Sequence, residues 1–202
     1  MQEILGIFGG TFDPPHLGHL TLAAKAFKEL QLTRLLWVPT PRAPHKLNHR
    51  ISAPHHRIEM LKRTVENNPG FEISTIEIDR PGPTFTLDTI NLLKVQYPGA
   101  RLVLLMGSDL LPGLPYWKGS HALINSVDRI GVMHRPGHKI DLITLDQTLP
   151  GLAAKLVLFD NSPLEISSTS IRQRITSSGD YCYHLPTSVC DYIQKNQPYS
   201  QV

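Results

Sequence analysis

Two histidines near the start of the chain, His16 and His19, have a spacing that suits joint chemistry on an anion. They belong to the string G-G-T-F-D-P-P-H-L-G-H at residues 9–19, and three residues apart on a helix they share one face. Gly9 and Gly10 allow a tight turn and the close approach of a ligand. The helix that follows would offer free N–H groups and the positive end of its dipole. The string therefore predicts a phosphate site in which both imidazoles donate to phosphate oxygens.

A second string far along the chain, I-S-S-T-S-I-R at residues 166–172, also suits phosphate binding. Ser168 and Thr169 supply hydroxyl donors at a predicted helix start, and Arg172 follows one turn later on the same side. Helix caps followed by arginine also occur where no ligand binds. This string therefore indicates a phosphate site only in combination with the first string. Neither the dinucleotide fingerprint GxGxxG nor the P-loop GxxxxGK[ST] is present at the first string.

These strings need a scaffold, and the apolar pattern indicates one. Runs typical of buried strands alternate with helical spacing, and Ser52 is expected to cap one of the helices. We expect an α/β fold: a Rossmann-like open parallel sheet with helices on both faces and short C-terminal helices, in one domain over residues 1–202. Ligands of such sheets bind at the carboxyl ends of the strands. The expected strands are residues 4–8, 35–38, 71–78, 102–106, 129–133 and 155–159.

Three further residues are placed where they could hold charged parts of a ligand. Lys46 lies in a Pro-rich basic loop and is either a phosphate contact or a solvated charge. Thr86 opens a predicted helix whose N–H groups and hydroxyls could hold a carboxylate. Arg135 directly follows an expected strand, at the same edge of the sheet.

Another group follows the expected central strand. Gly107 and Asp109 belong to the segment G-S-D at its end. Asp109 can bind a ribose hydroxyl there, or it can cap a helix. Trp117 comes shortly afterwards and can stack on a planar ring, or it can fill the core.

Taken together, these motifs resemble the HxGH nucleotidyltransferase superfamily, whose members join a nucleotide to a phosphate ester. The resemblance covers nearly the whole chain. G-S-D, a following tryptophan, R-P-G and a threonine-rich helix start make it most similar to the bacterial nicotinate-nucleotide adenylyltransferases. Ala43 replaces the first proline of their PPHK-like segment. The resemblance implies adenylyl transfer from ATP to nicotinate mononucleotide in NAD biosynthesis, giving deamido-NAD and pyrophosphate.

The same resemblance implies a role for each matching residue. His16, His19, Lys46 and Arg172 are expected to be catalytic because they neutralise phosphate charge. Residues expected to bind ATP are Gly9, Gly10, Thr11, Phe12, His16, His19, Gly107, Asp109, Ile166, Ser168, Thr169 and Arg172. Residues expected to bind nicotinate mononucleotide are Thr11, Lys46, Thr86, Asp109, Trp117 and Arg135, with the tryptophan stacked on the ring and the threonine at its carboxylate. Mg²⁺ is expected on the triphosphate, held by phosphate and water without a protein metal cage.

Composition restricts the classes of partner. The chain has 202 residues, of which 41% are hydrophobic and 18% charged, so it has the material for a core and is not disordered. A net charge of +3 from 20 basic residues suits anionic small molecules better than nucleic acid. We expect no membrane span and no secretory leader. The expected partners are therefore ATP and nicotinate mononucleotide, with no nucleic acid or membrane, for a monomer or a homo-oligomer.

Two cysteines, Cys182 and Cys190, are too few for a disulfide scaffold and do not form a CxxC pair. They predict a reduced, cytoplasmic protein in which the thiols only pack. The ten histidines raise the alternative of a zinc site. Zinc sites favour cysteine ligands, and both cysteines lie far away in sequence, so we expect none.

Other functions share parts of this pattern. Related nucleotidyltransferases act on nicotinamide mononucleotide, on phosphopantetheine or on glycerol phosphate, and the first string alone does not separate them. A nucleotide-binding module without catalysis is an alternative from another class. Such a module would tolerate loss of the two histidines, yet both are present.

Overall fold

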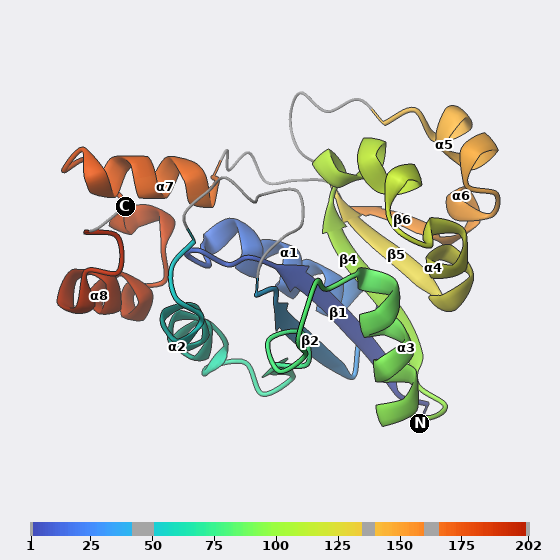
Figure 1. Cartoon of the computed structure of the whole chain (residues 1–202), viewed down its shortest axis with the longest axis horizontal. Helices are drawn as coiled ribbons and strands as arrows, with labels where there is room; N and C mark the ends of the chain where they lie inside the picture. Colours follow the sequence, from blue (N-terminus) through green and yellow to red (C-terminus); the bar gives the residue numbers. More distant parts are fainter. Residues whose placement is uncertain (1, 42–50, 135–139, 160–165, 201–202) are drawn as a thin grey trace.

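A computed structural model describes residues 2–41, 51–134, 140–159 and 166–200. Its centre is a six-stranded sheet in the order β3-β2-β1-β4-β5-β6, and every neighbouring pair is parallel. The chain builds outward from β1 to β3, returns to the middle at β4, and then builds outward on the other side (Figure 1). The predicted fold class is confirmed. The strands are β1 (Ile4–Gly10), β2 (Arg34–Pro39), β3 (Phe71–Ile73), β4 (Arg101–Gly107), β5 (Arg129–Met133) and β6 (Leu156–Phe159).

Helices cover both faces because alternate strand residues point to opposite sides. One face of β4, with Leu104 and Met106, packs against apolar residues of α3 and α4. The other face, with Val103 and Leu105, packs against α1 and α2. The helices are α1 (Leu17–Glu29), α2 (Pro54–Val65), α3 (Thr86–Gln96), α4 (Ser120–Ser126), α5 (Leu142–Thr148), α6 (Leu152–Lys155), α7 (Ser168–Thr176) and α8 (Thr187–Asn196), with 3-10 turns at Ser108–Tyr116 and Cys182–His184.

Two local predictions are wrong for identifiable reasons. The expected strand at 71–78 ends at Ile73, and the chain then turns so that Glu77 faces inward to Thr89 of α3. Ser52 does not cap α2, whose N-cap is Ala53 with proline in its first turn. Ser52 instead donates its backbone N–H to the carboxylate of Asp13 at 3.1 Å.

The C-terminal helices form a separate layer beside α2 at one end of the molecule (Figure 1). Within this layer, α8 packs against α2. Its buried residues Val189 and Ile193 join Ile171 of α7 and Met60 of α2 in one apolar cluster.

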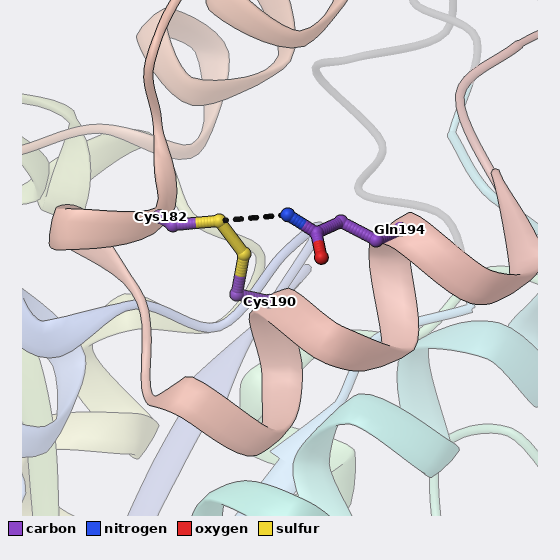
Figure 2. Close-up of a disulfide and its surroundings, with 3 residues drawn as sticks. All are labelled: Cys182, Cys190 and Gln194. Atoms are coloured by element: carbon purple, nitrogen blue, oxygen red, sulfur yellow. Dashed lines mark hydrogen bonds between the residues drawn. A yellow bond between two sulfur atoms is a disulfide. The ribbon is translucent and has the colours of Figure 1, made fainter.

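The two cysteines lie in this layer. Cys182 and Cys190 form a disulfide that ties the 3-10 turn to α8 across eight sequence positions, as Figure 2 shows. The amide of Gln194 approaches the sulfur of Cys182 at 3.6 Å. This pairing corrects the expectation of two reduced thiols, because the turn at 182–184 folds back onto the first turn of α8 and brings the side chains together. Among the described residues, no helix is long and apolar enough to cross a membrane.

Candidate active site

A cavity of about 590 Å³ opens at the carboxyl ends of β1 and β4. This is the point where the strand order reverses, the position at which open α/β sheets bind ligands. Six residues predicted for the site line it: Gly9, Gly10, Thr11, Thr86, Asp109 and Trp117. The sheet therefore brings together residues from the first string, the start of α3 and the segment after β4.

Gly9 and Gly10 make the floor of this cavity out of backbone. A Cβ on Gly9 would meet no atom within 4 Å, so the backbone there faces open space. A Cβ on Gly10 would come within 2.9 Å of the Phe12 ring, so a larger residue there would displace that ring. Phe12 itself is buried and packs edge-on against Phe8 at 5.3 Å between ring centroids. Its side chain supports the loop from beneath and does not line the cavity.

The two histidines lie face to face at the start of α1. Their ring centroids are 3.7 Å apart, and the backbone N–H of His16 donates to Nδ1 of His19 at 3.2 Å. His16 is buried as the N-cap residue of α1, while His19 is half-buried against Phe12. A Cβ on Gly18 would come within 3.1 Å of the His16 ring, so the small residue between the histidines keeps that ring in place. The pair can present imidazole donors beside the free N–H groups of the helix.

The second string meets the first in space. Ser168 Oγ donates to the carbonyl of Pro14 at 2.9 Å, and an Nη of Arg172 donates to the carbonyl of Asp13 at 2.6 Å. The other Nη of Arg172 contacts the hydroxyl of Thr169 at 3.4 Å. The start of α7 is therefore docked on the loop that leads to the histidines, although more than 150 residues separate them.

Part of the cavity lining is aromatic and cationic. Trp117 is half-buried and lines the cavity, whereas Trp37 is fully buried in the core. Lys118 places its ammonium 4.2 Å from the centroid of the Phe85 ring, next to the first residue of α3, Thr86. A flat ring and an anion would both find suitable partners here.

Sequence reasoning missed Glu77 and Thr89, which line the cavity together with Thr84. Thr89 donates to Oε1 of Glu77 at 2.7 Å, and burial raises the pKa of Glu77. The buried hydroxyl of Thr84 also interacts with the Glu77 carboxyl group and opposes the effect of burial on its pKa. No sequence signal marked Glu77. It lies in the stretch 71–78, where apolar and polar residues alternate as in a strand, so a polar residue there was unremarkable.

Other predicted site residues are placed differently. Gly107 ends β4 opposite Met133 and does not line the cavity, and Ile166 packs in the apolar cluster of α7 and α8. Lys46 and Arg135 lie outside the described residues.

Among the described residues, the acidic groups form no metal cage. In the described part of the chain, no three His, Cys, Asp or Glu residues are grouped to hold a metal ion. Asp13, the carboxylate nearest the histidines in sequence, is buried, and both of its oxygens accept protein hydrogen bonds. Asp109 lines the cavity from the turn after β4.

Comparison with known proteins agrees with this geometry. A family model described as cytidylyltransferase-like matches residues 7–174. A nicotinate-nucleotide adenylyltransferase of Bacillus subtilis is 37% identical over 195 residues, which cover 96% of this chain and 97% of that protein. A probable nicotinate-nucleotide adenylyltransferase of Thermomicrobium roseum is 39% identical over 198 residues, covering 98% of this chain and 92% of the relative.

A solved structure shares the fold. The nicotinic acid mononucleotide adenylyltransferase of Plasmodium falciparum, complexed with NaAD, superimposes with a TM-score of 0.80 at 22% identity and covers 98% of both chains. The fold, the cavity at the strand reversal and the full-length sequence similarity agree. The chain therefore belongs to the cytidylyltransferase-like nucleotidyltransferases and, within them, to the nicotinate-nucleotide adenylyltransferase family.

Proposed function

We propose that this chain, as a single domain over residues 1–202, transfers the adenylyl group of ATP to nicotinate mononucleotide. The products are deamido-NAD and pyrophosphate. One observation carries the proposal: a cavity with aromatic and cationic lining is bounded by Gly10 and Thr11, and these residues begin the loop that leads to the stacked histidines. In this proposal the pyridine nucleotide occupies the cavity, and the triphosphate lies along the adjoining histidine loop.

Each part of the site receives a substrate group in this scheme. Gly9, Gly10 and Thr11 approach the nucleotide, and Asp109 binds a ribose hydroxyl. The pyridine ring stacks on Trp117, and its carboxylate meets Thr86 and the free N–H groups at the start of α3. Both oxygens of Asp13 already accept protein hydrogen bonds, so a Mg²⁺ ion bound with ATP would be held by the phosphates and water and would neutralise phosphate charge.

The reaction needs no covalent enzyme intermediate. An oxygen of the mononucleotide phosphate attacks the α-phosphorus of ATP, a new P–O bond forms, and the bond to the β-phosphate breaks in line. His16, His19 and Arg172 neutralise charge on the three phosphates while pyrophosphate leaves. From their sequence motifs, Lys46 is assigned to a phosphate contact and Arg135 to the binding of nicotinate mononucleotide.

The setting of the activity belongs to the proposal. We place it in the cytoplasm, for a monomer or a homo-oligomer without nucleic-acid or membrane partners. The disulfide between Cys182 and Cys190 is unusual for that compartment. Trapping thiols in freshly lysed cells, followed by mass measurement of the intact chain, would tell whether the pair is oxidised there.

Pyrophosphate release tests the proposed substrate. Nicotinate mononucleotide and nicotinamide mononucleotide are compared in parallel with ATP and Mg²⁺. A site built around a carboxylate rejects the uncharged amide strongly, so we expect a preference of at least about a hundredfold for the nicotinate form. Equal rates would refute the assignment of the pocket around Thr86 and Trp117. No release with either would refute the proposed acceptor and direct the search to phosphopantetheine.

A further inference from the structure

Three buried polar side chains lie in, or are hydrogen-bonded to, the loop that carries the histidines. Asp13 belongs to that loop, Arg57 to α2 and Tyr199 to the segment after α8, and they are 1%, 0% and 2% exposed. The proposed transfer uses neither Arg57 nor Tyr199. Burying charged groups and a phenol costs free energy unless their polar atoms form hydrogen bonds. The hydrogen-bond partners of Arg57 and Tyr199 therefore identify the parts of the site that these side chains hold in place.

Arg57 binds backbone carbonyls on three sides of the site. Its guanidinium donates to Thr11 at 2.9 Å, to Thr40 at 2.7 Å and to Ser52 at 3.1 Å. These carbonyls follow β1, follow β2 and precede α2, so one side chain ties the ends of two neighbouring strands. Burial lowers the pKa of Arg57, and the nearby charge of Asp13 opposes this effect.

Tyr199 fixes the carboxylate that balances this charge. Its hydroxyl donates to Oδ1 of Asp13 at 3.1 Å, and the backbone N–H of Ser52 donates to Oδ2 at 3.1 Å. Burial, followed by the charge of Asp13, raises the pKa of Tyr199 well above its usual value, so the hydroxyl keeps its proton and remains a donor. The carbonyl of Asp13 accepts from Arg172 at the same time.

We propose that Tyr199 is a positioning residue for adenylyl transfer, because its hydroxyl fixes Asp13 and through it the loop that sets His16 and docks Arg172. The C-terminal segment thereby becomes part of the phosphate half of the site without touching substrate. This inference rests on the proposed function. It also predicts that loss of the Tyr199 hydroxyl disturbs the residues that bind the triphosphate. Binding of the pyridine ring near Trp117 should not change.

The test removes one hydroxyl. In Tyr199→Phe we expect kcat to fall about tenfold, the size of one lost hydrogen bond to a charged group. The KM for nicotinate mononucleotide should stay within about twofold. Tyr192→Phe is the matched control: Tyr192 lies in the same C-terminal region, and its hydroxyl is 2.7 Å from Nδ1 of His56 rather than on the Asp13 loop. Thermal unfolding of both variants shows whether each is folded at the assay temperature.

A double-mutant cycle of Tyr199→Phe and Asp13→Asn tests the proposal even if Tyr199→Phe is less stable than the wild type, because it measures whether the two residues act together. If Tyr199 acts through Asp13, then adding Tyr199→Phe to Asp13→Asn should lower kcat by less than about twofold further. Wild-type kcat in Tyr199→Phe, an equal loss in Tyr192→Phe, or independent losses in the cycle would each overturn the proposal. If the wild-type protein itself releases no pyrophosphate with nicotinate mononucleotide, the proposed function fails and this inference fails with it. If the wild type is active and Tyr199→Phe matches it, only the positioning role is wrong.

Discussion

The guanidinium of Arg172 donates a hydrogen bond of 2.6 Å to the backbone carbonyl of Asp13, which lies 159 residues earlier in the chain. This contact joins the two strings that suggested a phosphate site. It also limits how Arg172 works, since one Nη is held by the loop and the other contacts Thr169. The arginine is therefore oriented before any substrate arrives, which is the condition for electrostatic catalysis without reorganisation.

Replacing Arg172 should damage both the loop and the phosphate site. For Arg172→Ala we expect kcat/KM for ATP to fall about a hundredfold, by ~2.7 kcal/mol. Arg172→Lys should recover only part of this, because lysine lacks the planar fork that reaches two acceptors. Steady-state kinetics with varied ATP measures both. Arg174→Ala, an exposed arginine on the same helix, is the control and should keep wild-type values.

His19 should matter for turnover more than for folding. Its ring is half-buried and stacks on His16, so His19→Ala removes a phosphate donor together with a limited packing contact. We expect kcat to fall at least about a hundredfold while the circular dichroism spectrum is unchanged. Normal turnover in a folded His19→Ala protein would remove this residue from the mechanism.

The variant Gly18→Ala, which adds one methyl group, tests whether the position of the His16 ring matters for turnover. A Cβ there would lie 3.1 Å from Cε1 and Nδ1 of the His16 ring, closer than ordinary contact. Alanine favours helix over glycine by roughly 0.5–1 kcal/mol, so Gly18→Ala should not lower the unfolding temperature greatly. Its kcat should nevertheless fall about tenfold because the ring is displaced. Wild-type kcat in this variant would mean that the exact place of His16 is unimportant.

Much of this arrangement could be predicted from sequence, for physical reasons. The strand at 102–106 is recognisable because a central parallel strand is buried on both faces and is therefore continuously apolar. The histidine string is recognisable because strand, turn and helix start are contiguous. The contact between Tyr199 and Asp13 could not be predicted, since it joins residues 186 positions apart and has no local pattern. The inward turn at Glu77 was hidden for the same reason: its partner Thr89 belongs to the next helix.

Glu77 should make stability depend on pH. Burial raises its pKa above the ordinary value of 4.5, so as the pH rises the unfolded chain ionises at this residue before the folded protein does. The free energy of unfolding should therefore fall, relative to Glu77→Gln, as the pH rises from about 4.5 to the raised pKa, by ~1.4 kcal/mol for each pH unit in that interval. Urea unfolding of both proteins across this range measures the difference.

The exposed Glu66 provides the control for this experiment. Glu66→Gln should show no comparable trend against wild type, because its side chain lies in solvent. A wild-type protein whose stability relative to Glu77→Gln is the same at every pH would contradict the burial argument.

The disulfide should contribute to stability and not to catalysis. It closes a short loop across eight positions, for which chain entropy predicts about 2–3 kcal/mol. Cys182→Ala should lose that amount in urea unfolding, and its kcat should be unchanged because the pair lies away from the cavity. A reductant should lower the stability of the wild type to that of the variant and leave the variant unaffected. Equal stability of the two proteins without reductant would show that the bond does not contribute.

The most direct test of adenylyl transfer follows the phosphorus atoms of ATP. The enzyme is supplied with nicotinate mononucleotide and Mg²⁺, and with ATP labelled at either the α- or the γ-phosphate. We expect the α label to appear in deamido-NAD and the γ label in pyrophosphate, in equal amounts and only when the mononucleotide is present. Alpha label found only in AMP, or γ label transferred to the mononucleotide, would contradict adenylyl transfer at this site.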